Sequence, residues 1–199
     1  MKTYILTVML SCFSIQFINA QFSTSHAIYT TGELNLGNYI GFDLNLNYVY
    51  KETYSLKIGY TGNLRTPKSQ PENYSSGFES IFSFGTTNPY DQLENIQIGA
   101  GKIYKLNTKG TIRLNLSAGL GYTIIREPEN WHPIDNPFLT ENYTWQYRKY
   151  NTLSFVLNPK IEFPISKIYG LTVSPLLILN KDRTYIGIGI GQMLGVLRP

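Results

Sequence analysis

The sequence is poor in the residues that build most metal and redox sites. Among its 199 residues there is one cysteine, Cys12, and there are two histidines, His26 and His132. A single thiol forms no intramolecular disulfide and no cluster of thiolate ligands. His132 has acidic neighbours but no second histidine near it in the sequence, whereas a metal site needs several convergent ligands. We therefore expect no bound metal and no cofactor.

Charged residues and long apolar runs are also scarce. There are 17 Lys and Arg against 13 Asp and Glu, and the basic residues form no cluster of the kind found in nucleic-acid-binding proteins. No uninterrupted apolar stretch reaches the roughly 18 residues of a transmembrane helix. These absences argue against a nucleic-acid partner and against a helical membrane span in the mature chain.

The first twenty residues have the pattern of an export signal. Lys2 gives a positive start, an apolar run follows, and the small-residue site at residues 18–20 precedes Gln21. A lipid anchor on Cys12 is the alternative, but the apolar run continues past that residue to Ile18. We expect a signal peptide over residues 1–20 and one domain over residues 21–199.

Behind this leader, apolar side chains recur at every second position, which is the period of a β-strand. In residues 111–124, Ile, Leu, Ala and Tyr at even positions alternate with Thr, Arg, Asn, Ser and Gly at odd positions. The same period predicts eight strands, near residues 26–34, 39–50, 54–61, 95–104, 111–124, 153–165, 171–180 and 185–194.

The connections between these strands alternate in length. Short turns are expected at residues 51–53, 105–110 and 166–169, and long loops at residues 66–91 and 127–149. An up-and-down antiparallel barrel has this pattern, and outer-membrane barrels place the short turns in the periplasm and the long loops outside. We therefore predict an all-β protein, an up-and-down antiparallel eight-stranded transmembrane β-barrel.

The size of the interior decides which face of this barrel contacts lipid. Side chains just fill an eight-stranded barrel, so five to seven Leu, Ile, Phe or Tyr per strand would overfill it, and the Gly-, Ser-, Asn- and Thr-rich face fits inside. Tyrosines near the strand ends suit the aromatic girdles at the two membrane surfaces. They are Tyr48, Tyr50, Tyr54, Tyr60, Tyr104, Tyr122 and Tyr150. Three prolines remove ladder donors and are expected at bulges or strand ends; they are Pro159, Pro164 and Pro175.

The leader ending in Ala20-Gln21, the eight alternating strands and the Gly-rich residues 185–194 resemble the small outer-membrane β-barrel proteins of Bacteroidetes-type bacteria. The resemblance covers the mature chain as a pattern and implies contact with outer-membrane lipid and insertion by the barrel assembly machinery. Members of this family commonly end on an aromatic residue, whereas residues 194–199 contain none.

Five charged residues fall on the predicted inward face. Because isolated buried charges are costly, we expect them to pair or to meet water. They are Asp43, Lys57, Arg113, Lys160 and Glu162.

The two long loops are the candidate binding surfaces because exposed aromatic side chains often mark interaction sites. The alternative is that these rings pack loop against loop. The candidate binding residues are Tyr74, Phe78, Phe82, Phe84, Trp131, Phe138, Tyr143 and Trp145.

These features predict a non-enzymatic outer-membrane protein with a structural or surface-interaction role. Its partner would be another envelope protein or an extracellular molecule of unknown identity. A narrow small-solute channel is the second hypothesis. A lipid-modifying barrel enzyme that uses His26 or His132, and a soluble lipocalin-like periplasmic carrier, are two less favoured alternatives.

Overall fold

The computed structural model describes residues 26–77, 88–135 and 141–197. The predicted signal peptide lies outside these residues, as do four of the candidate binding aromatics, Phe78, Phe82, Phe84 and Phe138. No helix in the described part of the chain is long and apolar enough to cross a membrane.

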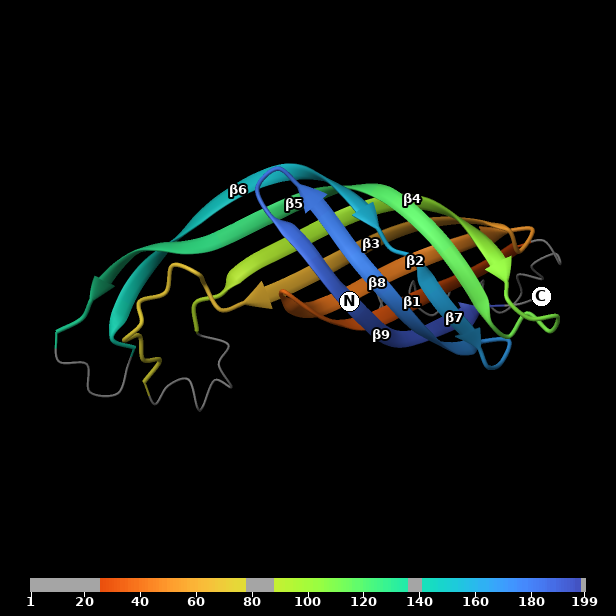
Figure 1. Ribbon diagram of the computed structural model, residues 1–199, viewed down its shortest axis with the longest axis horizontal. Helices are drawn as coiled ribbons and strands as arrows, with labels where there is room; N and C mark the ends of the chain where they lie inside the picture. Colours follow the sequence, from red (N-terminus) through yellow and green to blue (C-terminus); the bar gives the residue numbers. More distant parts are fainter. Residues whose placement is uncertain (1–25, 78–87, 136–140, 198–199) are drawn as a thin grey trace, which may run out of the picture.

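The described residues form nine antiparallel strands (Figure 1). They are β1 (His26–Gly37), β2 (Ile40–Tyr50), β3 (Tyr54–Arg65), β4 (Asp91–Lys105), β5 (Arg113–Pro133), β6 (Tyr143–Leu157), β7 (Lys160–Pro164), β8 (Tyr169–Asn180) and β9 (Thr184–Val196).

Eight positions around a closed ring hold these nine strands, because β6 and β7 share one position. Strands β1 to β5 each pair with the next strand in the chain, β6 and β7 both pair with β5 on one side and β8 on the other, and β8 pairs with β9. Strand β9 returns to pair with β1 over Ile28↔Val196 to Gly37↔Gly187. The ring is therefore an up-and-down barrel without a free edge, which confirms the predicted fold class.

One strand predicted as continuous, near residues 153–165, is interrupted at residues 158–159. Pro159 lies in the interruption and Pro164 is the last residue of β7, as the loss of a ladder donor predicts. Pro175 lies inside β8 and directly faces the interruption, because Leu157 pairs with Leu177 and Ile161 pairs with Val173.

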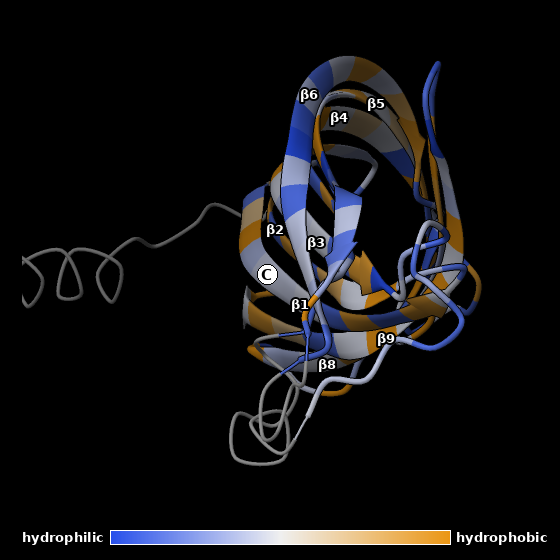
Figure 2. Ribbon diagram, turned by 90° about the vertical axis from the view of Figure 1, so that its left-hand side faces the viewer, coloured by the Kyte–Doolittle hydropathy of each residue, from blue (hydrophilic) through white to orange (hydrophobic). Residues whose placement is uncertain are grey.

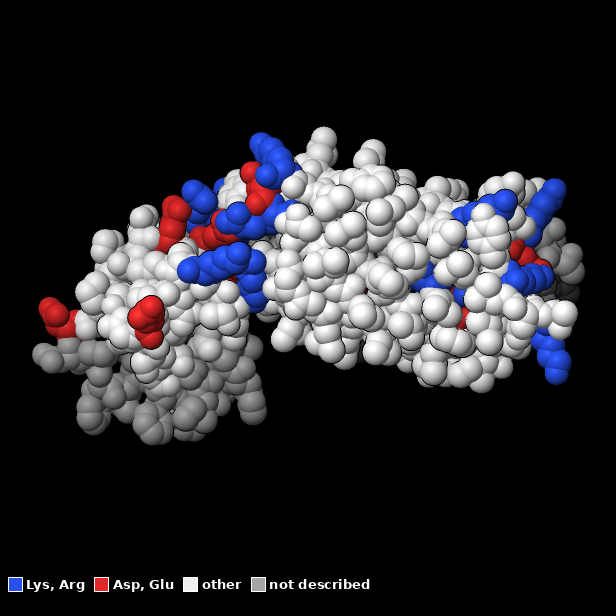
Figure 3. All heavy atoms as spheres, viewed as in Figure 1, with Lys and Arg blue, Asp and Glu red and all other residues white. Residues whose placement is uncertain are grey.

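The apolar face of the barrel points outward, as predicted. Leucine and isoleucine side chains are exposed all around the ring, for example Leu34 at 73%, Ile98 at 67% and Leu153 at 77%. Bands of opposite hydropathy alternate along the strands in Figure 2. Figure 3 shows a broad zone without charged residues between two groups of charged side chains, one toward each end of the barrel. This belt contradicts the lipocalin-like alternative, in which the apolar face would line a cavity.

The end of the barrel that carries the short β2–β3 and β4–β5 turns is called the turn end. Tyrosines flank the outward apolar zone there, and Tyr50, Tyr54 and Tyr104 are all exposed. Tyr150, predicted to share this girdle position, instead donates its hydroxyl to Glu127 at the opposite rim. It does so because it lies on the same strand face as the inward Thr152 and Ser154.

The interior is layered along the barrel axis rather than uniformly polar. Along β2, Val49 lies near the turn end and Asp43 lies in the middle, while Tyr39 directly precedes the strand. Polar residues fill the middle of the interior, and a buried apolar cluster lies toward each end. The turn-end cluster comprises Ala27, Tyr29, Val49, Ile103, Met193 and Leu197. The cluster toward the opposite end comprises Tyr39, Leu93, Val156, Leu176, Ile178 and Tyr185.

The predicted long loop at residues 127–149 is largely a β-hairpin. Strand β5 has 21 residues, about twice the roughly 9–11 that span a bilayer, and it pairs with β6 out to Pro133↔Tyr143. Figure 1 shows β5 and β6 running beyond the rest of the barrel at this end. The loop prediction was wrong here because Pro128, Asn130 and Pro133 interrupt the period of two that identifies a strand.

Candidate functional site

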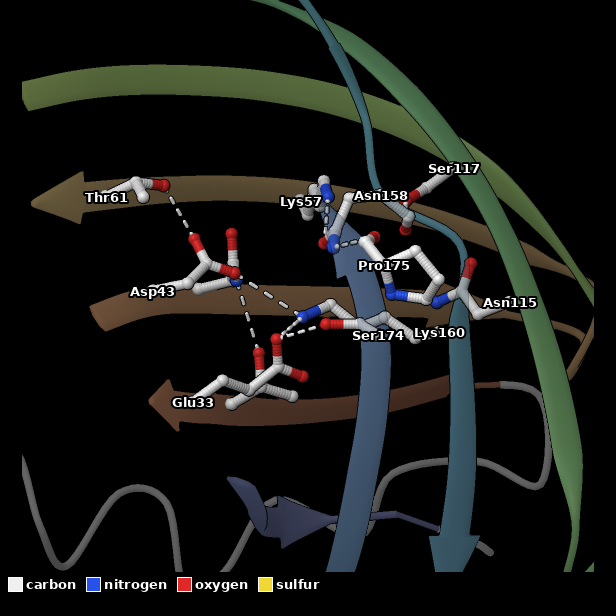
Figure 4. Close-up of polar contacts among 12 residues, drawn as sticks. Glu33, Asp43, Lys57, Thr61, Asn115, Ser117, Asn158, Lys160, Ser174 and Pro175 are labelled. Carbon is white, nitrogen blue, oxygen red and sulfur yellow. Dashed lines mark hydrogen bonds and ion pairs between the residues drawn. The ribbon is translucent and has the colours of Figure 1, made fainter. Parts of the chain in front are cut away.

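The middle of the barrel holds a network of paired charges. Lys160 Nζ lies 2.7 Å from Glu33 Oε2 and 3.4 Å from Asp43 Oδ2. Thr61 donates a hydrogen bond to Asp43, and Ser174 donates to Glu33 (Figure 4). Asp43 also accepts hydrogen bonds from Asn45 and Gln97. The network joins β1 to β4 with β7 and β8 and so ties opposite walls of the barrel together.

A second buried ion pair lies nearer the turn end. Arg113 Nη2 is 2.7 Å from Glu162 Oε2, and both side chains are almost fully buried. Tyr29 and Asn115 donate to the other carboxylate oxygen of Glu162 at 2.7 and 3.1 Å. Arg113 also donates to the backbone carbonyl of Leu197, which ties the end of the chain to the barrel wall.

All five sequence-predicted inward charges are buried, and four of them form ion pairs. The fifth, Lys57, donates to the side-chain oxygen of Asn158 at 2.8 Å. Sequence reasoning missed Glu33, although it stands on the polar face of β1 between Thr31 and Asn35. The alternation of this strand with Leu34 and Leu36 was the signal that could have found it.

At the other extreme of the molecule, aromatic rings gather on the projecting hairpin. Trp131 and Trp145 face one another from β5 and β6 with ring centroids 5.6 Å apart. Tyr74 meets both indoles edge-on, at 5.7 and 6.3 Å, and Tyr143 meets Trp131 at 6.3 Å. These four residues are the described members of the predicted binding set, and we refer to them as the aromatic platform.

A β-bulge turns Trp131 into this platform. The register of β5 and β6 shifts between Glu129↔Gln146 and His132↔Thr144, so two residues of β5 face Trp145 alone. Asn130, the first of the two, has φ 57°, and asparagine tolerates this left-handed conformation better than most residues. The bulge bends the hairpin and sets the direction of the indole.

Hydrogen bonds fix the segment 69–75 to the hairpin beside the platform. Trp131 Nε1 donates to Ser69 Oγ, and Ser69 Oγ donates to the carbonyl of Pro128. Asn142 exchanges backbone and side-chain hydrogen bonds with Ser75, and Tyr143 donates to Asn73. Thus the rings pack partly against each other, as the loop-on-loop alternative states, and together they make an ordered surface.

A charged clamp closes the base of the hairpin, beyond the apolar belt. Glu127 accepts hydrogen bonds from Tyr150, Arg183 and Arg148. Burial alone would raise the pKa of the Glu127 carboxyl, but these hydrogen bonds and the charge of Arg183 outweigh it and lower that pKa. Burial and the bond to Glu127 raise the pKa of Tyr150 to about 12.

The two histidines lie far from each other in the strand arrangement. His26 is at the turn end, where its Nδ1 is 2.7 Å from the hydroxyl of Tyr48, and His132 is exposed in the hairpin. No group of three or more His, Cys, Asp or Glu able to hold a metal occurs among the described residues.

Comparison with known proteins gave relatives by structure alone. No family model matches the sequence, and no curated protein matches it. The attachment invasion locus protein Ail of Yersinia pestis superposes with a TM-score of 0.52 at 10% identity, over 87% of this chain and 99% of Ail. The N-terminal β-barrel domain of Pseudomonas aeruginosa OprF gives 0.51 at 13% identity, over 87% of this chain and 98% of that domain.

Identities this low show the fold and leave open the Bacteroidetes-type group to which the sequence pattern pointed. Barrel closure, the outward apolar belt and these neighbours agree with one another. The chain has the fold of the small outer-membrane β-barrel proteins.

Proposed function

We propose that this protein is a non-enzymatic component of the bacterial outer membrane that presents the β5–β6 hairpin to a partner outside the cell. The observation that carries the proposal is the hairpin itself, which continues well past the membrane-spanning part of β5 and is held by the aromatic platform. A rigid projecting surface loses little conformational entropy on binding.

The lengths of the connections support an orientation in which the hairpin lies outside the cell. The turn end carries the short turns, and the opposite end, from which the β5–β6 hairpin projects, carries the long connections. Outer-membrane barrels have the same arrangement, and their long loops face outward. One structural neighbour is named an attachment invasion locus protein. This name favours a surface-interaction role and identifies no partner here.

Side chains that point away from the platform are the candidate contacts. Thr144 and Gln146, which alternate with the platform residues along β6, are exposed. His132 on β5 is exposed on the same hairpin. These residues, rather than the mutually packed indoles, would touch an envelope protein or an extracellular molecule.

Site-specific photo-crosslinking in living cells tests the proposal. A benzophenone side chain at Gln146 should give discrete adducts with one partner, whereas the same group at the belt residue Leu120 should give none of these adducts. The same adducts should vanish when residues 131–145 are replaced by a two-residue Asn-Gly turn. Absence of any adduct from Gln146, Thr144 and His132 in correctly inserted protein would contradict the proposed role.

A further inference from the structure

The hydrogen-bond ladder of the barrel wall is broken where residues 158–159, between β6 and β7, face β8. The register on the two sides of the break is the same, because Leu157↔Leu177 and Ile161↔Val173 fit one continuous pairing. No residue is inserted, so the ladder is interrupted without a bulge. Counting along this register places Pro159 directly opposite Pro175.

Two missing hydrogen-bond donors explain the interruption. The backbone nitrogen of Asn158 donates to the carbonyl of Ser117 in β5, so the polar backbone groups of the next residue, Pro159, point the other way, toward β8. At this position two opposed residues normally exchange a pair of N–H···O bonds. Neither proline has an N–H, and so both bonds are absent.

Asn158 closes the resulting gap toward the interior. Its side-chain nitrogen donates to the Pro175 carbonyl at 3.1 Å, and its side-chain oxygen accepts from Lys57 (Figure 4). Ser117 Oγ donates to the backbone carbonyl of Asn158 at 2.7 Å. On its interior side the gap is therefore closed by polar groups that have hydrogen-bond partners, and it is open toward the outside of the barrel.

A cavity of about 550 Å³ lies at this gap, on the outer surface. Its wall is formed by outward side chains of β4, β5, β6, β8 and β9, and by the two prolines. Ala100 and Ala118 are small at positions where most outward residues of the barrel are Leu or Ile, so they leave the space that the cavity occupies. The lining includes Ala100, Leu116, Ala118, Leu157, Pro159 and Pro175.

We propose that this cavity is a binding site for one acyl chain of an outer-membrane lipid. The site lies in the belt of exposed leucine and isoleucine, where the surrounding medium is hydrocarbon. Its lining is almost wholly apolar, and the absent proline N–H groups remove the donors that would otherwise be exposed to lipid. A hydrocarbon chain fills such a cavity without leaving a polar group unpaired. The inference rests on membrane insertion and is independent of any partner of the hairpin.

Photolabelling with a lipid probe tests the site. The full mature chain is reconstituted in phosphatidylcholine vesicles that contain a small fraction of phosphatidylcholine with a diazirine on one acyl chain. After irradiation, adducts are mapped by mass spectrometry. Labelling should be several-fold higher on residues 116–118, 157–159 and 175–177 than on the equally lipid-facing Ile58 and Leu153.

Two variants of neighbouring outward residues of β5 provide a matched comparison. Ala118→Phe fills the cavity and should reduce its labelling to the level of the surrounding belt, whereas Leu120→Phe should leave the labelling unchanged. A double variant, Pro159→Val with Pro175→Val, restores both donors and should also abolish the excess by closing the ladder.

Uniform labelling around the belt, or equal labelling in the Ala118→Phe and Leu120→Phe proteins, would overturn the site. A gel shift on boiling verifies that each variant is a folded barrel. A protein that shows no shift and stays soluble without detergent would instead overturn the membrane location itself, so the two failures are distinguishable.

Discussion

Lys160 in β7 and Glu33 in β1 form an ion pair of 2.7 Å across the middle of the barrel, with both side chains buried. Asp43 adds a second carboxylate 3.4 Å from the same ammonium group. Strands β1 and β2 carry the two carboxylates and lie far in the sequence from β7, which carries the ammonium group. They meet β7 only when the ring closes. This pairing therefore ties barrel closure to charge neutrality in the interior.

Replacing Lys160 with methionine should destabilise the barrel strongly. The change leaves the Glu33 and Asp43 carboxylates buried without their cation, and breaking a buried ion pair on one side costs about 3–5 kcal/mol. Denaturant unfolding in detergent micelles measures the free energy. Lys149→Met, at an exposed position on the rim, is the control and should change it by less than about 1 kcal/mol. Equal effects of the two changes would contradict the central network.

Asn158→Ala should also weaken the barrel, by a smaller amount. It removes the hydrogen bond to the Lys57 ammonium and the bond to the Pro175 carbonyl, and a bond to a charged group contributes about 1.5–3 kcal/mol. The same unfolding measurement applies.

The Pro159→Val, Pro175→Val double variant should instead raise the free energy of unfolding, by about 0.5–1.5 kcal/mol for each restored hydrogen bond. A loss of stability would contradict the account of the gap.

The wild-type protein should show no stepwise conductance in planar lipid bilayers. Two apolar clusters bracket the ion-paired middle of the interior, and an eight-stranded barrel has an interior that side chains just fill. Regular current steps that change when Arg113 or Lys57 is neutralised would contradict this expectation and would favour the channel hypothesis.

The charged clamp at Glu127 should make the hairpin base sensitive to acid. Because the pKa of this carboxyl is lowered in the folded protein, its contribution to stability is fully present above the ordinary value of 4.5 and is lost as the pH falls below 4.5 through the folded pKa. The temperature of the gel shift should fall over this acid range in the wild type. In Glu127→Gln that part of the pH dependence should be absent, and an unchanged profile would contradict the assigned role.

Trp131→Ala should loosen the segment 69–75 without unfolding the barrel. The change removes the hydrogen bond to Ser69 and the ring contacts with Tyr74, Tyr143 and Trp145. Chymotrypsin added to whole cells should then cut this segment faster than in the wild type. Gln146→Ala, at an exposed position on the face of β6 opposite to Trp145, is the control and should leave the rate unchanged.

The sequence alone predicts most of this barrel because one face of each strand must suit lipid and the other must suit a narrow interior. The alternation in residues 111–124 is enough to place Arg113 inside and Leu120 outside. The break at Pro159 is only half visible, since its effect depends on Pro175, which arrives opposite it from another strand.

The hairpin and the missed carboxylate show the limits of a period-two pattern. Pro128 and Asn130 interrupt the alternation, yet cross-strand pairing carries β5 and β6 through the bulge to Pro133↔Tyr143. The partners of Lys160 could not be predicted either, because Glu33 and Asp43 are set by ring closure and not by spacing in the chain.

Protease accessibility on intact cells, read on gels with and without boiling, tests the central claim most directly. A closed outer-membrane barrel with a projecting hairpin should migrate differently after boiling. External chymotrypsin should cut it only within residues 66–90 and the hairpin beyond Glu127, and the belt should stay protected. A protein that remains soluble without detergent, shows no shift on boiling, or is cut at the β2–β3 turn from outside would contradict the account.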